Sequence, residues 1–546
     1  MCSASKVSDA LDGIIDLKIE SPLVVTNILL ESGCIFKRGV GTLTFAAAPG
    51  LTTALSVNNG TNGGNGMPVS FDVGNIASDA WPHPTTGYSG FNVAEGEVVL
   101  AGDGETAFLI PHKVSVGLRS SGARAIPSLV VDGARAELAS QDQLNLSGPL
   151  GVAGGLCAIA RISIVNGANV TTRGLRTGGY PNYVSTFPTA VVDRATWTVS
   201  SSPAIYGTGS PQGYMTFVFR NGARCYFQQE INQWSVGGAR FILTDSVLAK
   251  SAALDPIRAV NICQDGTMGG YWLIGSNVVF AAAKIGNQHD VGKYGNGPML
   301  IDMDGGEWRL APYTLHLTNA SQVVMTSIRE AGATLYAARE ATVCVARAIT
   351  GPGGIAKTGE GGLRFEVQGE WTGDATPALV SNLTDSVSLA FEGLFDVREG
   401  SAFVERGACR SGGAYRAGLD ASIDFDGNDL GSGASFRGSG TFLNASATDS
   451  AIRVPLDGNF TATDGCPAFD GVSLKGRVRV EFELASAPHG RSREITVARF
   501  SEPLGRLSNW SDGGVGKGYG VALVKSSDGK SVLARIAKLG IRINLR

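Results

Sequence analysis

The chain has 546 residues, of which 75 are glycine and 21 are proline, and only 17% carry a charge. This composition excludes a mainly helical protein, because a glycine inside a helix costs about 1 kcal/mol relative to alanine. Collagen is excluded because glycine does not recur at every third position, and an apolar fraction of 43% excludes a disordered chain. A net charge of −3 gives no electrostatic basis for binding nucleic acid. Many short strands joined by tight turns are expected.

The beginning of the chain carries charges throughout, at Lys6, Asp9, Asp12, Asp16 and Lys18. These charges leave no room for the apolar core of a secretory signal, so no signal peptide is expected in this chain. Further along, no apolar run reaches the roughly 18 residues that a membrane-spanning helix needs. The sequence therefore predicts no transmembrane segment.

A short phrase recurs in which a strand-forming run leads into a glycine turn and out into another run. Its core is Asp, Asn or Ala, then Gly, then Ala or Gly, and it occurs in 131–138, 165–170, 219–225, 303–308 and 330–336. Asn-Gly and Asp-Gly favour tight turns because both residues accept positive φ. In a hairpin such a turn reverses the chain, whereas in a coil it turns a corner. The irregular recurrence fits a degenerate repeat of coil length, which favours a β-solenoid over antiparallel sandwiches.

A longer pattern occurs twice. Residues 37–45 and 357–365 both read Lys-x-Gly-x-Gly-x-Leu-x-Phe. Each copy is followed by a related phrase, Phe-Asn-Val-Ala-Glu-Gly at 91–96 and Phe-Asp-Val-Arg-Glu-Gly at 395–400. Two motifs repeated in the same order indicate an internal structural repeat.

The second copy also has Trp-Thr-Gly at 371–373, and the whole pattern resembles the autotransporter-associated β-strand repeat of bacterial surface and secreted passenger proteins. The clear matches cover about 33–100 and 351–445, and the phrases at 421–428 and 436–442 are similar to those that follow the repeat in such proteins. The first copy departs from the pattern, with Pro-Gly-Leu-Thr-Thr at 49–53 in place of Tyr-Thr-Gly. The resemblance implies a right-handed parallel β-helix in an exported, extracellular or cell-surface setting, without self-export.

The fold expected is therefore all-β, a right-handed parallel β-helix or β-solenoid with a small β-rich C-terminal cap. Residues 1–32 are predicted to be an N-terminal cap, residues 33–445 the solenoid, and residues 446–546 a C-terminal β-rich region or cap. Both ends of a solenoid are open sheet edges that must be covered. In such a coil alternate side chains point inward, so the aromatic stretch 197–272 is expected to form inward ladders rather than an exposed row.

Acidic side chains near the middle of the chain suggest one catalytic alternative. Asp302 and Asp304 share a strand face, Glu307 and Arg309 follow the next glycine turn, and Trp308 is a candidate sugar-stacking platform. The competing interpretation, which we favour, is that Asp304 is simply the turn residue of its coil. No catalytic, cofactor-binding or metal-ligating residue is assigned, and no cofactor is expected.

Two other residue groups are interpreted structurally. The run Asp424-Phe-Asp-Gly-Asn-Asp429 lacks the spacing of an EF-hand loop and is expected to form a solvated turn at a coil corner. The eight cysteines include no close pair, so most are expected to be single buried residues on strands. They are Cys2, Cys34, Cys157, Cys225, Cys263, Cys344, Cys409 and Cys466.

The leading hypothesis is a non-catalytic, exported or surface-associated scaffold of the adhesin type, with glycans or surface proteins as its partners. The alternatives are a polysaccharide lyase or glycoside hydrolase on the same fold, and a trimeric phage or virion fibre. The sequence leaves the ligand, the oligomeric state and the disulfide state open.

Overall fold

The chain forms two compact units, residues 1–302 with 321–324 and residues 303–320 with 325–546. All regular structure in the described residues of this computed structural model is β-strand, which confirms the all-β fold. The residues described are 2–3, 14–26, 28–30, 34–47, 53–57, 90–93, 95–110, 114–117, 126–146, 157–158, 160–177, 185–186, 188–201, 204–206, 214–234, 238–258, 260–261, 271–282, 285–286, 299–310, 315–316, 324–339, 342–345, 349–365, 391–409, 411–490 and 492–539.

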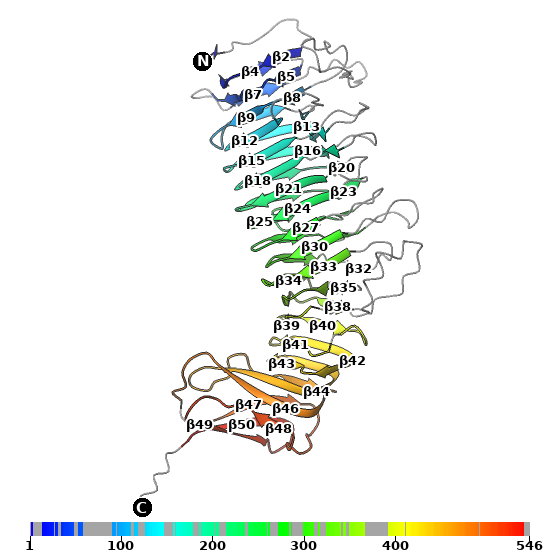
Figure 1. Ribbon diagram of the computed structural model, residues 1–546, viewed down its shortest axis with the longest axis vertical. Helices are drawn as coiled ribbons and strands as arrows, with labels where there is room; N and C mark the ends of the chain where they lie inside the picture. Colours follow the sequence, from blue (N-terminus) through cyan, green and yellow to red (C-terminus); the bar gives the residue numbers. More distant parts are fainter. Residues whose placement is uncertain are drawn as a thin grey trace, which may run out of the picture. The chain divides into compact units, whose positions relative to one another are not determined.

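A long parallel sheet runs through the first unit, and each successive coil of the chain adds one strand to it (Figure 1). Arg161 faces Thr189, Thr189 faces Thr216 and Thr216 faces Arg240, spacings of 28, 27 and 24 residues. The predicted stacking of coils is therefore confirmed. In order, the paired strands are β1 (Cys2–Ser3), β3 (Leu23–Thr26), β6 (Leu43–Ala46), β9 (Glu97–Ala101), β12 (Ser128–Asp132), β15 (Arg161–Val165), β18 (Thr189–Asp193), β21 (Tyr214–Arg220), β24 (Gly238–Leu243) and β27 (Tyr271–Ile274).

Two further faces complete each coil of the first unit. Strands β13 (Arg135–Leu146) and β16 (Asn169–Thr177) serve both faces, because their pairing shifts register midway. Beyond them, one face continues through β19 (Thr196–Val199), β22 (Ala223–Phe227), β25 (Ser246–Ala249) and β28 (Val279–Ala281), and the other through β20 (Ala204–Tyr206), β23 (Ile231–Trp234), β26 (Val260–Asn261) and β29 (Ile285–Gly286). Before them lie β4 (Ile28–Leu30), β7 (Thr53–Val57) and β10 (Ala107–Ile110) on one face, and β2 (Ile14–Lys18), β5 (Cys34–Arg38), β8 (Gly90–Val93) and β11 (Val114–Val116) on the other.

The glycine phrases turn corners between these faces. Gly133, Gly167 and Gly222 have φ of 63°, 82° and 82°, in the left-handed region that glycine accepts without strain. Asn166 and Asn221 precede two of them with φ of 56°. The strands on either side of each corner pair with other coils rather than with each other. The glycine phrases therefore form corners of the coil and not hairpins.

The interior of the first unit is filled by apolar ladders. Phe217 faces Phe241, and Phe241 faces Trp272 on the next strand. Their rings stack with centroids 4.4 Å and 3.8 Å apart, and all three are buried. Stacked aromatic pairs add roughly 0.5–1.5 kcal/mol to the burial of their area. The predicted inward ladder of aromatic side chains is confirmed for these residues.

The second unit has a parallel arrangement of its own, with shorter coils. Asp396 faces Arg416 and Arg416 faces Arg437, spacings of 20 and 21 residues. One face holds β31 (Glu307–Leu310), β34 (Ala333–Ala337), β37 (Ile355–Thr358), β39 (Leu394–Val397), β41 (Ala414–Ala417) and β43 (Ser435–Gly438). A second holds β32 (Leu315–His316), β35 (Thr342–Val345), β38 (Gly362–Phe365), β40 (Ser401–Val404), β42 (Ser422–Ser432) and β44 (Thr441–Leu456). A third is formed by the parallel pair β33 (Val324–Ile328) and β36 (Ile349–Thr350).

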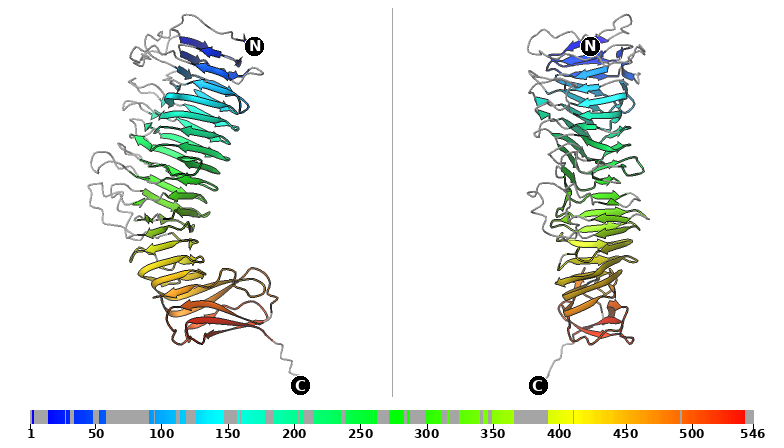
Figure 2. Two further views of the ribbon diagram at one scale, coloured as in Figure 1. Left: turned by 180° about the vertical axis from the view of Figure 1, so that it is seen from behind. Right: turned by 90° about the vertical axis from the view of Figure 1, so that its right-hand side faces the viewer.

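The parallel order ends near the C-terminus of the second unit, where antiparallel pairing begins (Figure 2). Strand β47 (Arg493–Phe500) pairs in parallel with β45 (Ala468–Asp470) but antiparallel with β50 (Ser531–Lys538), and β50 pairs antiparallel with β49 (Tyr519–Lys525). Strand β44 pairs with β46 (Ser473–Leu484), and β46 with β48 (Trp510–Asp512). The right hand of the coil and the division into caps at 1–32 and 446–546 stay predictions.

Candidate functional site

Lys37, in the first copy of the repeat, is completely buried at the end of β5. Its Nζ donates to the carbonyl oxygens of Gly39 and Gly41, each at 2.6 Å, and to that of Glu95 at 2.7 Å. The Glu95 side chain completes the arrangement, because its Oε2 accepts from the backbone N–H of Gly39 at 2.9 Å. An ammonium group has three donors, and all three are used on the backbone.

Lys357, in the second copy, repeats this arrangement. It is also completely buried, and its Nζ donates to the carbonyl oxygen of Gly359 and, at 2.6 Å, to that of Glu399. The Oε2 of Glu399 accepts from the N–H of Gly359 at 2.9 Å, as Glu95 does from Gly39. We call each set a lysine clamp: Lys37 with Gly39, Gly41 and Glu95, and Lys357 with Gly359 and Glu399.

The strand register explains why the two motifs of each copy occur together. Strand β5 pairs with β8 so that Lys37 faces Val93, and β37 pairs with β39 so that Lys357 faces Val397. The Glu-Gly that ends the second motif is thereby brought onto the lysine of the first. Gly96 has a φ of 68°, and a side chain there would collide with Lys37 Nζ and with the carbonyl oxygen of Gly39.

Burial and charge act in opposite directions on the clamp lysines. Burial lowers the pKa of Lys37 to about 8, and the carboxylates of Glu95, Glu97 and Glu20 work against that shift. Burial likewise lowers the pKa of Lys357 to about 8, opposed by Glu399. The sequence marked both lysines as part of a repeat, but it gave them no role, because the Glu95 carbonyl becomes a partner only through the strand pairing.

The candidate acidic group of the enzyme hypothesis is engaged in local contacts. Asp302 is buried and its Oδ2 accepts from the hydroxyl of Tyr271 at 3.2 Å. Glu307 pairs with Arg309 at 2.5 Å. Trp308 is only 3% exposed, so its ring does not offer the open face that stacking on a sugar needs.

Asp304 lies directly before the corner at Gly305, whose φ is 88°. This position agrees with the interpretation of Asp304 as the turn residue of its coil. No group of three or more His, Cys, Asp or Glu side chains that could hold a metal ion occurs in the described part of the chain.

The Asp424–Asp429 run, expected from the sequence to form a solvated turn, lies instead within β42, where the chain bends at Asp426 and Gly427, with φ of 49° and 74°. Asp424 Oδ1 accepts from the N–H of Asp426, and Asp429 Oδ1 from the N–H of Gly431. Asn428 is buried instead, and its Nδ2 donates to three carbonyl oxygens, those of Val404, Glu405 and Phe425. The sequence did not reveal this role, although an asparagine among aspartates at a corner is a recognisable signal.

Three cysteines are described as free thiols. Cys225 and Cys466 are buried and Cys409 is half-buried, in line with single cysteines on or beside strands. Burial raises the pKa of Cys409 to about 11, while a contact of 3.0 Å with the Tyr415 hydroxyl works in the opposite direction. Such thiols are poor nucleophiles at neutral pH. The side chains of the other five cysteines lie outside the described set.

A row of charged side chains crosses the strands of the second unit. Asp396 faces Arg416, Arg416 faces Arg437, and the next strand adds Arg453. Arg416 donates to Asp396 at 2.7 Å and to Asp464 at 2.8 Å, and the hydrogen bonds that Asp464 accepts raise the pKa of Arg416 above its usual value. The sequence did not reveal this row, although the spacings of 20 and 21 residues between its first three members equal the coil length and are a recognisable signal.

No protein-family model matches the chain, and no curated protein matches it. Among the described residues there is no helix that is long and apolar enough to cross a bilayer.

Proposed function

We propose that the chain is a non-catalytic β-solenoid scaffold of the adhesin type, exported by or exposed on the surface of a bacterium. The observation that carries this proposal is the pair of lysine clamps. Ionisable groups with strongly shifted pKa values often mark active sites. Here, the two lysines with lowered pKa values donate to backbone carbonyl oxygens and so hold successive coils in place.

The N–H groups of Lys37 and Asn428 are all used on the backbone, which supports a structural role for both side chains. The three hydrogen bonds of Lys37 use every N–H that an ammonium group has, so none is left for a substrate. Asn428 uses its amide in the same way, with both N–H groups directed at backbone carbonyls. These polar side chains stabilise the coils rather than facing a reaction centre. The exported setting rests on the resemblance of the two lysine motifs to the autotransporter-associated repeat.

The scaffold and enzyme hypotheses differ in what the purified chain does to polysaccharides. We expect no new reducing ends and no ultraviolet absorbance from unsaturated uronate ends after long incubation with neutral and uronate-containing polysaccharides. Either product, lost in the Glu307→Gln variant, would replace the scaffold proposal with a hydrolase or a lyase.

The location is tested separately on intact cells of the source bacterium. Antibody labelling and brief protease treatment should reach the chain without lysis. A chain that is protected until the cells are broken would contradict the exported setting. Sedimentation of the purified chain tests the fibre alternative, which requires a trimer.

A further inference from the structure

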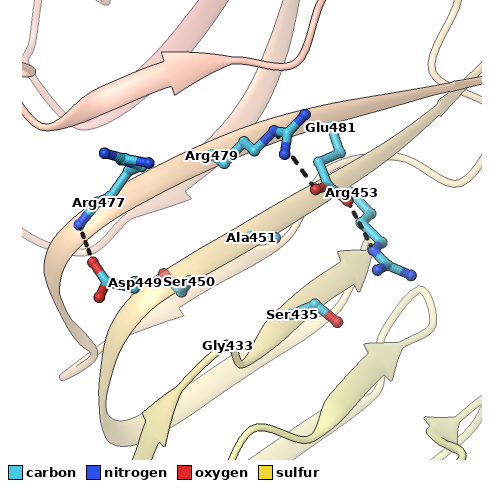
Figure 3. Close-up of a pocket in the computed structure, with 9 residues that line it drawn as sticks. All are labelled: Gly433, Ser435, Asp449, Ser450, Ala451, Arg453, Arg477, Arg479 and Glu481. Atoms are coloured by element: carbon cyan, nitrogen blue, oxygen red, sulfur yellow. Dashed lines mark hydrogen bonds and ion pairs between the residues drawn. The ribbon is translucent and has the colours of Figure 1, made fainter.

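The second unit has a hollow of about 750 Å³ on the outer face of β43, β44 and β46 (Figure 3). Its volume lies within the range of roughly 300–1,000 Å³ that is usual for ligand pockets. Small residues form the middle of the hollow, namely Gly433, Ser435 and Ala451. Long charged side chains surround them, and these are Arg453, Arg477, Arg479, Glu481 and Asp449.

The strand register produces this shape. Ser435 faces Ala451, and Ala451 faces Arg479 on the following strand. Two residues further along, Arg453 faces Glu481. Because alternate residues of a strand share a face, one row across the strands is short at Ser435 and Ala451, and the neighbouring row is long. The hollow is therefore built into the sheet.

The charges around the hollow are unequal. Glu481 is shared, at 3.2 Å from Arg453 Nε and 3.7 Å from Arg479 Nε. The Oδ1 of Asp449 accepts from the backbone N–H of Arg477 at 2.8 Å, so this carboxylate serves the main chain (Figure 3). In the described residues the guanidinium of Arg477 has no carboxylate partner, and Arg479 is 57% exposed. Three guanidinium groups, each with five N–H donors, thus line the hollow with two carboxylates, and a third carboxylate, that of Glu483, lies 4.0 Å from Arg453.

We propose that this hollow binds an oligosaccharide that carries carboxylate or sulfate groups. Arg477 and Arg479 contact the anionic group, because guanidinium groups form strong, often paired hydrogen bonds with such oxygens. Ser435 supplies a hydroxyl and Asp449 its second carboxylate oxygen, Oδ2, and both groups are of the kind that bind sugar hydroxyls. The two carboxylates of the lining disfavour a continuous polyanion such as nucleic acid. This binding does not depend on the scaffold role, and it is measured on the purified chain alone.

The test uses calorimetric titration of the full chain with three probes of similar size, digalacturonate, a heparin-derived sulfated disaccharide and neutral cellobiose. We expect heat of binding from one or both charged probes and none from cellobiose. The two charged probes distinguish a carboxylate from a sulfate as the preferred group. Binding of cellobiose with equal affinity, binding of none of the probes, or tighter binding of a short single-stranded DNA would overturn the proposal.

Variants locate the binding. Arg477→Gln and Arg479→Gln should each weaken binding about tenfold, the cost of a charge-assisted hydrogen bond. Glu481→Gln should strengthen it, because Arg453 and Arg479 lose their shared carboxylate. The matched control is Arg535→Gln on β50, an exposed arginine paired with Glu494 at 2.6 Å, which should leave affinity unchanged. An equal loss in that control would mean long-range charge rather than a site. Melting curves check that each variant folds.

Discussion

Replacing Lys37 with methionine removes the ammonium group of the first lysine clamp and keeps most of the side chain's apolar length. Three carbonyl oxygens, those of Gly39, Gly41 and Glu95, then lose a donor at 2.6–2.7 Å. Leaving a buried polar group unsatisfied costs about 1–3 kcal/mol, and removing one partner of a buried charged network costs about 3–5 kcal/mol. We expect Lys37→Met to destabilise its coils by about 3–5 kcal/mol.

The assay must be local, because coils of a solenoid interact mainly with their neighbours and can open separately. Hydrogen exchange followed by mass spectrometry should show faster exchange in peptides from 34–47 and 95–101, with little change beyond 160. Lys357→Met should give the same pattern around 355–365 and 395–404. Its effect should be somewhat smaller, because the structure shows two carbonyl acceptors there instead of three.

The matched control is Lys18→Met, the same substitution at a lysine whose side chain is 53% exposed and lies 3.7 Å from Glu20. Exposed ion pairs contribute about 0–1 kcal/mol, so this variant should exchange like the wild type. If Lys37→Met exchanges no faster than Lys18→Met, the clamp does not hold the coils and the reasoning is refuted. If exchange accelerates evenly along the whole unit, the coils unfold together and the local argument fails.

Three further predictions concern the first lysine clamp and Asn428. Gly96→Ala should lower the melting temperature of the chain more than Gly167→Ala does. Both glycines have positive φ, which costs an alanine about 1–2 kcal/mol, but only a side chain at position 96 meets other atoms. Equal effects of the two substitutions would mean that Lys37 can move aside. Folding lowers the pKa of Lys37 from 10.5 to about 8, so between these pH values the unfolded chain binds more protons than the folded chain. The stability of the wild type relative to Lys37→Met, measured by urea titration, should therefore rise from pH 8 to pH 10 by at most about 3 kcal/mol. A stability difference that falls over this range would contradict the lowered pKa. Asn428→Ala should cost about 2–4 kcal/mol by the same titration, because three carbonyl oxygens lose their donor, and a loss below about 0.5 kcal/mol would show that water replaces the amide.

The sequence predicted the corners better than the polar contacts, for a physical reason. A corner such as Asn166-Gly167 depends on the φ preferences of two adjacent residues, which are visible in any sequence. The inward orientation of Phe217 and Phe241 follows from alternation along each strand, which is also local, whereas their stacking depends on the register between the two strands. The contact between Lys37 and the Glu95 carbonyl depends on register between strands that are far apart in the chain, and no local pattern contains that register.

The charged row of the second unit also depends on register that the sequence does not contain. Asp396, Arg416 and Arg437 become a row only when the coil length of 20 and 21 residues is known, and the preceding coils of the chain differ from it. Conversely, Trp308 looks like a sugar platform in the sequence because aromatic residues serve that purpose when they are exposed. Whether it is exposed depends on which face of β31 is turned inward, and the structure buries it.

The position of the lysine clamps along the chain has an energetic explanation. Lys37 and the Glu95 carbonyl are 58 residues apart, and Lys357 and the Glu399 carbonyl 42, whereas Asp396 and Arg416 on adjacent coils are 20 apart. Closing a loop two to three times longer costs only about 0.6–1 kcal/mol more, because the entropy depends on the logarithm of length. One charge-assisted hydrogen bond contributes about 1.5–3 kcal/mol, so each clamp more than offsets the longer connection at its own coil. A solenoid can therefore accept a long connection wherever a lysine and a Glu-Gly corner meet, and the two motifs mark such positions in the sequence.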